Sequence, residues 1–97
     1  MIRTFESSDM SDVLNVWLEA TIRAHGFIGK EFWESRVSDM RETYIPASDT
    51  YVFLENGTVK GFFSLNGDSL AAMFVSPDAQ GNGIGKQLMK KAISLRK

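Results

Sequence analysis

A chain of 97 residues holds one domain at most, and so short a chain leaves much of its surface unburied. Its 11 basic and 12 acidic side chains nearly cancel, so no overall field would gather nucleic acid or an anionic membrane. The lack of cysteine excludes disulfides, thiolate metal sites and a cysteine nucleophile, and it agrees with a cytoplasmic protein. No signal-peptide core and no apolar run near the ~20 residues of a membrane span is present, so we expect neither secretion nor membrane insertion.

The first half of the chain predicts a short strand followed by two helices. The strand covers residues 2–5, and the Ser-Ser-Asp run at 7–9 offers side-chain oxygens that cap a helix start. Apolar side chains then recur at helical spacing up to an expected stop at Gly26, namely Met10, Val13, Leu14, Trp17 and Leu18. A second stripe predicts another helix, ended by Pro46, and it consists of Trp33, Val37, Met40 and Tyr44.

Three strands are predicted after Pro46, over residues 50–54, 59–65 and 70–75. The dipeptide Asn-Gly separates them, at 56–57 and at 66–67, and it is typical of tight hairpins in which both turn positions want positive φ. We therefore expect a three-stranded antiparallel meander.

A last amphipathic helix is predicted from Ile84 to the end of the chain. Its apolar stripe consists of Leu88, Met89, Ala92, Ile93 and Leu95. No repeat, linker or low-complexity tract suggests a second domain, so residues 1–97 are expected to form a single, partial domain. The predicted fold is α/β, of the α+β kind, with a mostly antiparallel sheet and the order β-α-α-β-β-β-α.

Three glycines at alternate positions, Gly81, Gly83 and Gly85, join the last strand to this helix. Without side chains, the backbone can approach a ligand closely and aim its N–H groups at one point. The free N–H groups and positive dipole end of the helix that starts near Ile84 favour a phosphate there. The alternative is a tight strand-to-helix turn with no ligand, which glycines also serve.

Two other phosphate-binding motifs do not match the residues of this loop. A Walker loop needs glycine where Gln80 stands and a hydroxyl where Gln87 stands. The dinucleotide pattern G-x-G-x-x-G fails as well, because its last position falls on Lys86 or Leu88. A nucleoside triphosphatase and a dinucleotide-binding protein are therefore disfavoured.

The run Gln80-Gly81-Asn82-Gly83-Ile84-Gly85 does match the pattern Gln/Arg-x-x-Gly-x-Gly/Ala, placed after Val75-Ser76-Pro77 and before an amphipathic helix. It resembles the coenzyme A pyrophosphate loop of GNAT-type N-acetyltransferases, and the element order agrees along the whole chain. The resemblance implies an acyl-CoA N-acyltransferase-like fold, truncated after the glycine-loop helix. It also implies acetyl-CoA as co-substrate, no metal, and direct attack by an amine.

The same resemblance implies roles for backbone groups. The N–H groups from Gln80 to Lys86 would hold the pyrophosphate. The strand at Met73, Phe74 and Val75 would pair its backbone with the pantetheine arm, and its main-chain groups would polarise the thioester carbonyl.

Candidate catalytic side chains are fewer. His25 lies near the end of the first helix, where the family lines its acceptor groove, and imidazole titrates near neutrality, so it is a candidate base. A surface histidine favoured by the helix dipole is the alternative. Asp68, and also Glu31 or Glu34, are candidates for attracting a cationic amine or relaying a proton, although each also fits a solvated charge.

Aromatic side chains surround the predicted corner between the first two helices, where they either wall an acceptor pocket or pack in the core. They are Trp17, Phe27, Phe32 and Trp33. Among the basic residues of the last helix, Lys86 alone lies near the glycine loop. The others are expected to form a solvated face, and they are Lys90, Lys91, Arg96 and Lys97.

Members of the family continue beyond this helix with a strand, a helix and a closing hairpin. That later helix usually carries a tyrosine that protonates the departing thiolate, and neither Tyr44 nor Tyr51 lies in an element that could replace it. An unpaired edge at residues 70–75 predicts self-association through that edge or through the last helix. The leading hypothesis is an N-acetyltransferase for a small-molecule or peptide amine. The alternatives are an inactive coenzyme A-binding or interaction module and a packing domain without a ligand.

Overall fold

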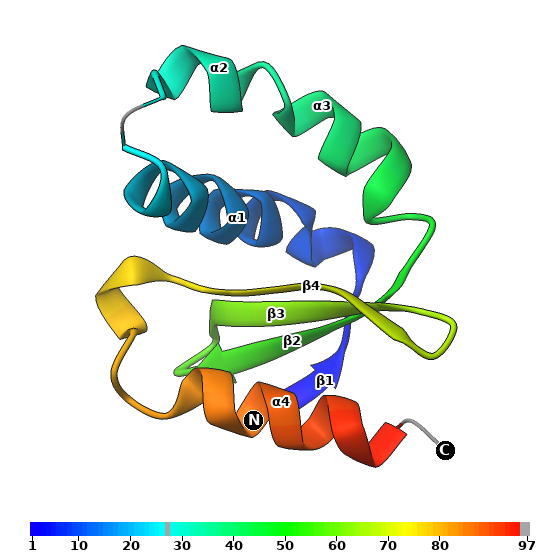
Figure 1. Cartoon of the computed structure of the whole chain (residues 1–97). Coiled ribbons are helices and arrows are strands. Elements are labelled where there is room, and N and C mark those ends of the chain that lie inside the picture. Colours follow the sequence, from blue (N-terminus) through cyan, green and yellow to red (C-terminus); the bar gives the residue numbers. More distant parts are fainter. Residues whose placement is uncertain (27, 96–97) are drawn as a thin grey trace.

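The computed structural model describes residues 1–26 and 28–95, so the roles predicted for Phe27, Arg96 and Lys97 lie outside the described residues. An antiparallel sheet forms the middle layer, with the strand order β1-β2-β3-β4 (Figure 1). The strands are β1 (Ile2–Thr4), β2 (Asp49–Glu55), β3 (Thr58–Asn66) and β4 (Ser69–Val75). The helices are α1 (Met10–Ala24), α2 (Lys30–Glu34), α3 (Val37–Asp39) and α4 (Ile84–Leu95). The predicted α+β fold with a mostly antiparallel sheet is confirmed.

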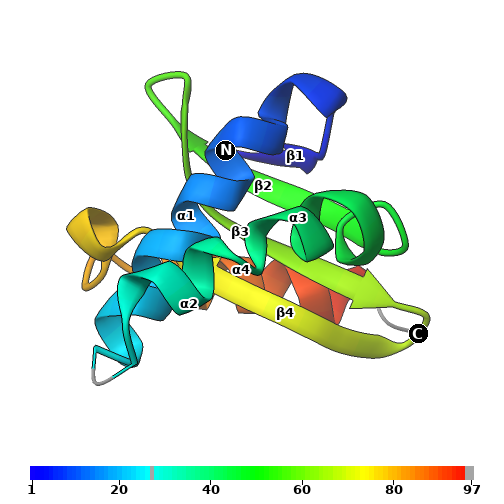
Figure 2. The ribbon, with the colours of Figure 1, turned by 90° about the horizontal axis from the view of Figure 1, so that it is seen from above.

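The helices lie on opposite faces of the sheet. One face carries α1, α2 and α3, and the other carries α4 (Figure 1). Seen from above, α2 and α3 lie on the β4 side of α1 (Figure 2). Among the described residues, no helix is both long and apolar enough to cross a membrane.

The start of α1 is fixed by a buried carboxylate. Asp9 ends the 3-10 turn η1 (Ser7–Asp9), and one carboxylate oxygen accepts the backbone N–H of Glu6 at 2.8 Å. The guanidinium of Arg3, in β1, donates to both oxygens of Asp9, at 2.7 and 3.0 Å. The predicted cap at 7–9 is wrong in one respect, because Asp9, the N-cap of α1, makes no side-chain bond to the backbone of that helix. Its carboxylate instead closes the η1 turn at Glu6, and its ion pair with Arg3 joins β1 to the start of α1.

Neutralising Asp9 is expected to destabilise the protein. The bond from Arg3 is the main cause that lowers the pKa of Asp9 below its ordinary value. A carboxylate with a lowered folded pKa contributes stability that is present above the unfolded pKa, about 3.9, and is lost as the pH falls through the folded pKa. We expect Asp9→Asn to reduce the free energy of unfolding by about 2 kcal/mol at pH 7. The difference from the unchanged protein should shrink below about pH 4, as urea unfolding at several pH values would measure. A difference that stays constant down to pH 2 would contradict this account.

The single second helix predicted over residues 33–44 is wrong in one respect, because the structure divides it. The helix α2 ends at Glu34, and the hydroxyl of Ser35 donates to the carbonyl of Phe32 at 2.5 Å. Such a local side-chain bond competes with the helical backbone bonds and so favours an end to the helix. After α3 comes a π-helical turn, η2 (Met40–Tyr44), which closes with the N–H of Ile45 bonded to the carbonyl of Met40 at 3.0 Å.

The three predicted strands are present as β2, β3 and β4, but their two hairpins turn differently. At the first hairpin, Asn56 and Gly57 both have positive φ, 54° and 79°, as predicted. At the second, Asn66 pairs with Ser69, so the turn consists of Gly67 and Asp68. Only Gly67 has positive φ there, at 61°, which is the pattern of a type II′ turn with glycine first. The turn predicted at 66–67 is thus displaced by one residue.

Alternation along β3 builds a separate core on each face of the sheet. Phe62 is fully buried beneath α1, and the next residue, Phe63, is fully buried beneath α4. Gly61 sets how closely α4 approaches, because a Cβ there would lie 3.0 Å from the carbonyl oxygen of Phe74 and 3.1 Å from a methyl carbon of Leu88. The first turns of α4 are therefore held tightly against β3 at Gly61.

Candidate functional site

The glycine loop follows β4 through a 3-10 turn, η3 (Pro77–Ala79), and leads into α4. Gly81 and Gly83 have φ of 89° and 80°, which side-chain-bearing residues rarely adopt. A Cβ built on either one would meet nothing within 4 Å. Gly85 is not in this conformation, and its Cβ would make only ordinary contact with Val75, at 3.7 Å. The loop is therefore open on the side where the glycines lack side chains.

The start of α4 offers unbonded donors to that open space. The N–H of Gln87 bonds to the carbonyl of Gly83 at 3.1 Å, as in the first turn of a helix. The N–H groups of Ile84, Gly85 and Lys86 come earlier in this turn, and such groups have no partner within the helix. Together with the positive end of the helix dipole they favour an anion, so the loop fits a pyrophosphate.

A small polar cluster anchors the loop to β3. Lys60 donates to one oxygen of Asp78 at 3.2 Å, and the hydroxyl of Ser76 donates to the other at 2.5 Å. The bond from Ser76, followed by that from Lys60, lowers the pKa of Asp78 below its ordinary value. Asp78 is thus ionised at neutral pH and ties the entry of the loop to the neighbouring strand.

The outer edge of β4 presents backbone groups beside the loop. The N–H of Ser76 bonds to the carbonyl of Lys60 at 2.8 Å, which marks a hydrogen-bonded pair at the end of the β3–β4 ladder. Such pairs alternate along antiparallel strands, so the backbone groups of Phe74 face β3. Those of Met73 and Val75 face away from β3, at the edge of the sheet. An extended ligand could therefore pair with Met73 and Val75, but not with Phe74.

This edge and the last helix are also the two surfaces at which self-association was predicted. A bulge between Ser64 and Leu65 disturbs the pairing with β4, and bulges limit how far an edge can be extended. On α4, Met89 and Ile93 are exposed. Self-association stays a prediction.

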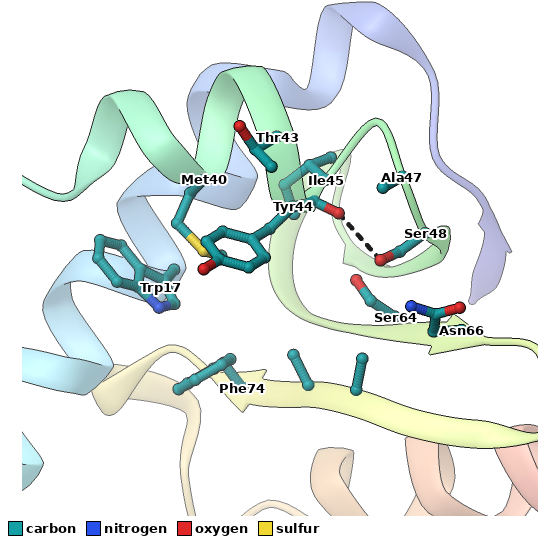
Figure 3. A pocket seen from close by; sticks show the side chains of 12 residues that line it. Trp17, Met40, Thr43, Tyr44, Ile45, Ala47, Ser48, Ser64, Asn66 and Phe74 are labelled. Atoms are coloured by element: carbon teal, nitrogen blue, oxygen red, sulfur yellow. Dashed lines mark hydrogen bonds between the residues drawn. The ribbon is translucent and has the colours of Figure 1, made fainter.

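A pocket of about 580 Å³ lies between η2, α1 and the β3–β4 strands. In Figure 3, Met40 and Tyr44 extend from η2, Trp17 comes from α1, and Phe74 lies on β4. The remaining lining is small, apolar or neutral and polar, and it consists of Thr43, Ile45, Ala47, Ser48, Ser64, Asn66, Ala71 and Ala72. None of the residues that line this pocket is a carboxylate, a lysine, an arginine or a histidine.

The predicted catalytic side chains lie away from this pocket. His25 caps the C-terminal end of α1, with its ring centroid 5.5 Å from that of Trp33. Asp68 is exposed at the tip of the β3–β4 hairpin. Glu31 and Glu34 are exposed on α2, and Glu34 lies 3.9 Å from Lys30. Their catalytic roles stay predictions, and the described residues contain no cluster of His, Asp and Glu that could hold a metal.

The predicted aromatic corner forms, because Trp17 is part of the core beneath α1 and Trp33 packs edge-on against it with ring centroids 6.4 Å apart. Trp17 also lines the pocket, and Phe32 packs on the far side of the corner against Trp33, with ring centroids 4.9 Å apart. Tyr44 was expected only as part of a helix stripe, yet 61% of it is exposed and it lines the pocket. A π-helical turn has no clear sequence signal, which is why Tyr44 was missed.

Comparison with known proteins assigns the family. Residues 8–97 match the family model described as an acetyltransferase (GNAT) domain. The chain belongs to the GNAT acetyltransferase family. Peptidyl-lysine N-acetyltransferase YiaC of Escherichia coli K12 is 40% identical to it over 91 residues, which cover 93% of this chain and 62% of YiaC. Peptidyl-lysine N-acetyltransferase YjaB of the same organism is 25% identical over 97% of this chain and 64% of YjaB. The chain thus spans less than two thirds of either GNAT relative.

Solved structures of GNAT proteins share the fold. The apo form of YjaB from Escherichia coli superposes with a TM-score of 0.84 and 25% identity, over 99% of this chain and 65% of that one. The PaiA N-acetyltransferase of Thermoplasma acidophilum, solved in complex with coenzyme A, gives a TM-score of 0.84 at 18% identity. That match covers 98% of this chain and 70% of PaiA.

Proposed function

We propose that this chain binds acetyl-CoA in the glycine loop and along β4, and that it serves the transfer of the acetyl group to the side-chain amine of a protein lysine. The proposal rests on one observation: the open glycine loop and the outward backbone groups of β4 lie next to each other along the chain. The open backbone at Gly81 and Gly83 faces the start of α4, and the outward backbone groups of Met73 and Val75 lie directly upstream.

The coenzyme would supply an acetyl thioester. The N–H groups at the start of α4 would hold its pyrophosphate, and Met73 and Val75 would keep its arm extended along the edge of β4. A ligand fixed at both ends is oriented for attack, which reduces the entropy lost in reaching the transition state. Main-chain N–H groups at the same edge could donate to a developing oxyanion.

The pocket beside β4 would receive the acceptor, because Ala71, Ala72 and Phe74 line it from the strand that borders the coenzyme. Its lining of rings, methyl groups and neutral polar atoms suits the four-carbon stem of lysine. An apolar surrounding also disfavours the charged ammonium, so more of the amine is neutral and able to attack. The names of YiaC and YjaB as peptidyl-lysine enzymes support this class of acceptor.

The test is turnover. Thiol release from acetyl-CoA should rise when a lysine-containing peptide is added and should stay at background with the same peptide acetylated on lysine. Replacing Ala47, an exposed alanine at the pocket, by tryptophan should raise KM for the peptide on the order of tenfold while the Kd of coenzyme A is unchanged. Coenzyme A binding with no turnover on any peptide would instead support a binding module.

A further inference from the structure

One side chain of the loop already bonds to the edge of β4. The carboxamide Nε2 of Gln80 donates to the main-chain carbonyl of Val75 at 3.1 Å. This carbonyl belongs to the backbone groups that face away from β3, as the register with Lys60 and Ser76 requires. Gln80 thus occupies an acceptor that an extended ligand on this edge would otherwise use.

The chemistry of that bond indicates what the carbonyl can bind. The donor is the N–H of an amide, uncharged and planar, on an exposed side chain. A secondary amide in an extended ligand offers the same donor, and the pantetheine arm of coenzyme A contains two such amides. A neutral donor also brings no charge that would compete for the phosphates in the loop.

We propose that Gln80 holds the Val75 carbonyl in the free protein and releases it to an amide N–H of the pantetheine arm when the coenzyme binds. The inference rests on the proposed function, since it assumes coenzyme A as the ligand. Gln80 is then a positioning residue, which keeps the end of β4 and the loop together until the arm replaces it. In this exchange, binding of the whole coenzyme breaks the bond from Gln80, whereas binding of the nucleotide part alone leaves the bond intact.

Two ligands and two variants test this exchange. Calorimetry would compare coenzyme A with adenosine 3′,5′-bisphosphate, which lacks the arm, on the unchanged protein, Gln80→Ala and Gln87→Ala. Gln87 is the matched control, because it is an exposed glutamine on α4. We expect Gln80→Ala to lower the Kd of coenzyme A by about three- to tenfold, as loss of one competing hydrogen bond predicts. The Kd of the bisphosphate should not change, and Gln87→Ala should change neither.

A second measurement needs no variant. The side-chain amide resonances of Gln80 should shift strongly when coenzyme A is added to the unchanged protein, and little with the bisphosphate. Equal effects of Gln80→Ala on both ligands, or weaker binding of both, would overturn the exchange and leave coenzyme binding standing. No binding of either ligand to the unchanged protein would overturn the proposed function itself.

Discussion

Replacing Gly83 by valine is expected to weaken coenzyme A binding by about thirtyfold or more while the sheet stays folded. Gly83 has φ of 80°, and valine strongly avoids this region because its branched Cβ clashes with the backbone. The loop would move away from the conformation that aims the N–H groups of α4 at one point. The new side chain would also fill the open space beside the loop, where nothing of the protein lies within 4 Å of a Cβ.

Gly57 supplies a matched control for this prediction. Its φ is 79°, and a Cβ there likewise meets nothing within 4 Å, but it lies in the β2–β3 hairpin. The substitution Gly57→Val therefore causes the same backbone strain but leaves the conformation of the glycine loop unchanged. Both substitutions should lower the midpoint of thermal unfolding by a similar amount. Calorimetry should find loss of coenzyme A binding only in Gly83→Val. Loss of binding in both variants would mean that general destabilisation, not the loop, is responsible.

Replacing Phe62 by alanine is expected to reduce the free energy of unfolding by about 3–5 kcal/mol. The side chain is fully buried in the core between α1 and the sheet, and its ring centroid lies 5.7 Å from that of Phe74. Its removal leaves a cavity beneath α1 and also removes the support of Phe74, which lines the pocket from β4. A small domain has a total stability of only about 5–15 kcal/mol, so this variant should be close to unfolded at moderate temperature.

Urea unfolding followed by tryptophan fluorescence would measure the loss. Phe32→Ala is the control, because Phe32 is the same residue type but is exposed on α2. It loses mainly its contacts with Trp33 and Arg36, so a reduction below about 1 kcal/mol is expected. A similar reduction in both variants would show that the core beneath α1 is not the main source of stability.

Much of the fold could be predicted because local signals and tertiary structure agree. The alternation in residues 61–65 assigns both faces of β3, whereas the register shift before Gly61 places Val59 on the same face as Phe62. Asn56-Gly57 adopts the positive φ that such a turn requires. The glycine loop was equally visible, since Gly81 and Gly83 need the conformation that glycine alone adopts easily. In these segments one residue type has one strong structural preference.

The remaining features depend on contacts between distant residues, which periodicity does not report. The one-residue displacement of the second turn follows from the pairing of Asn66 with Ser69. The sequence is compatible with two turn types, one with residues 66–67 at its centre and one with residues 67–68. The π-helical turn moves Tyr44 out of the expected helix stripe and into the pocket. The outward direction of the Val75 carbonyl follows from the register between β3 and β4, and it could be found only once that register was known.

The strand order β1-β2-β3-β4 also bears on how the chain folds. Each pair within the β2–β4 meander joins neighbours in the sequence across a two-residue turn, so these pairs close small loops at little entropic cost. The β1–β2 pair is different, because β1 must wait for a partner that is separated from it by all of the first three helices. Such long-range pairings slow folding, so we expect the meander to form early and β1 to pair with β2 late. The Arg3–Asp9 ion pair, which joins β1 to the start of α1, would form at that late step.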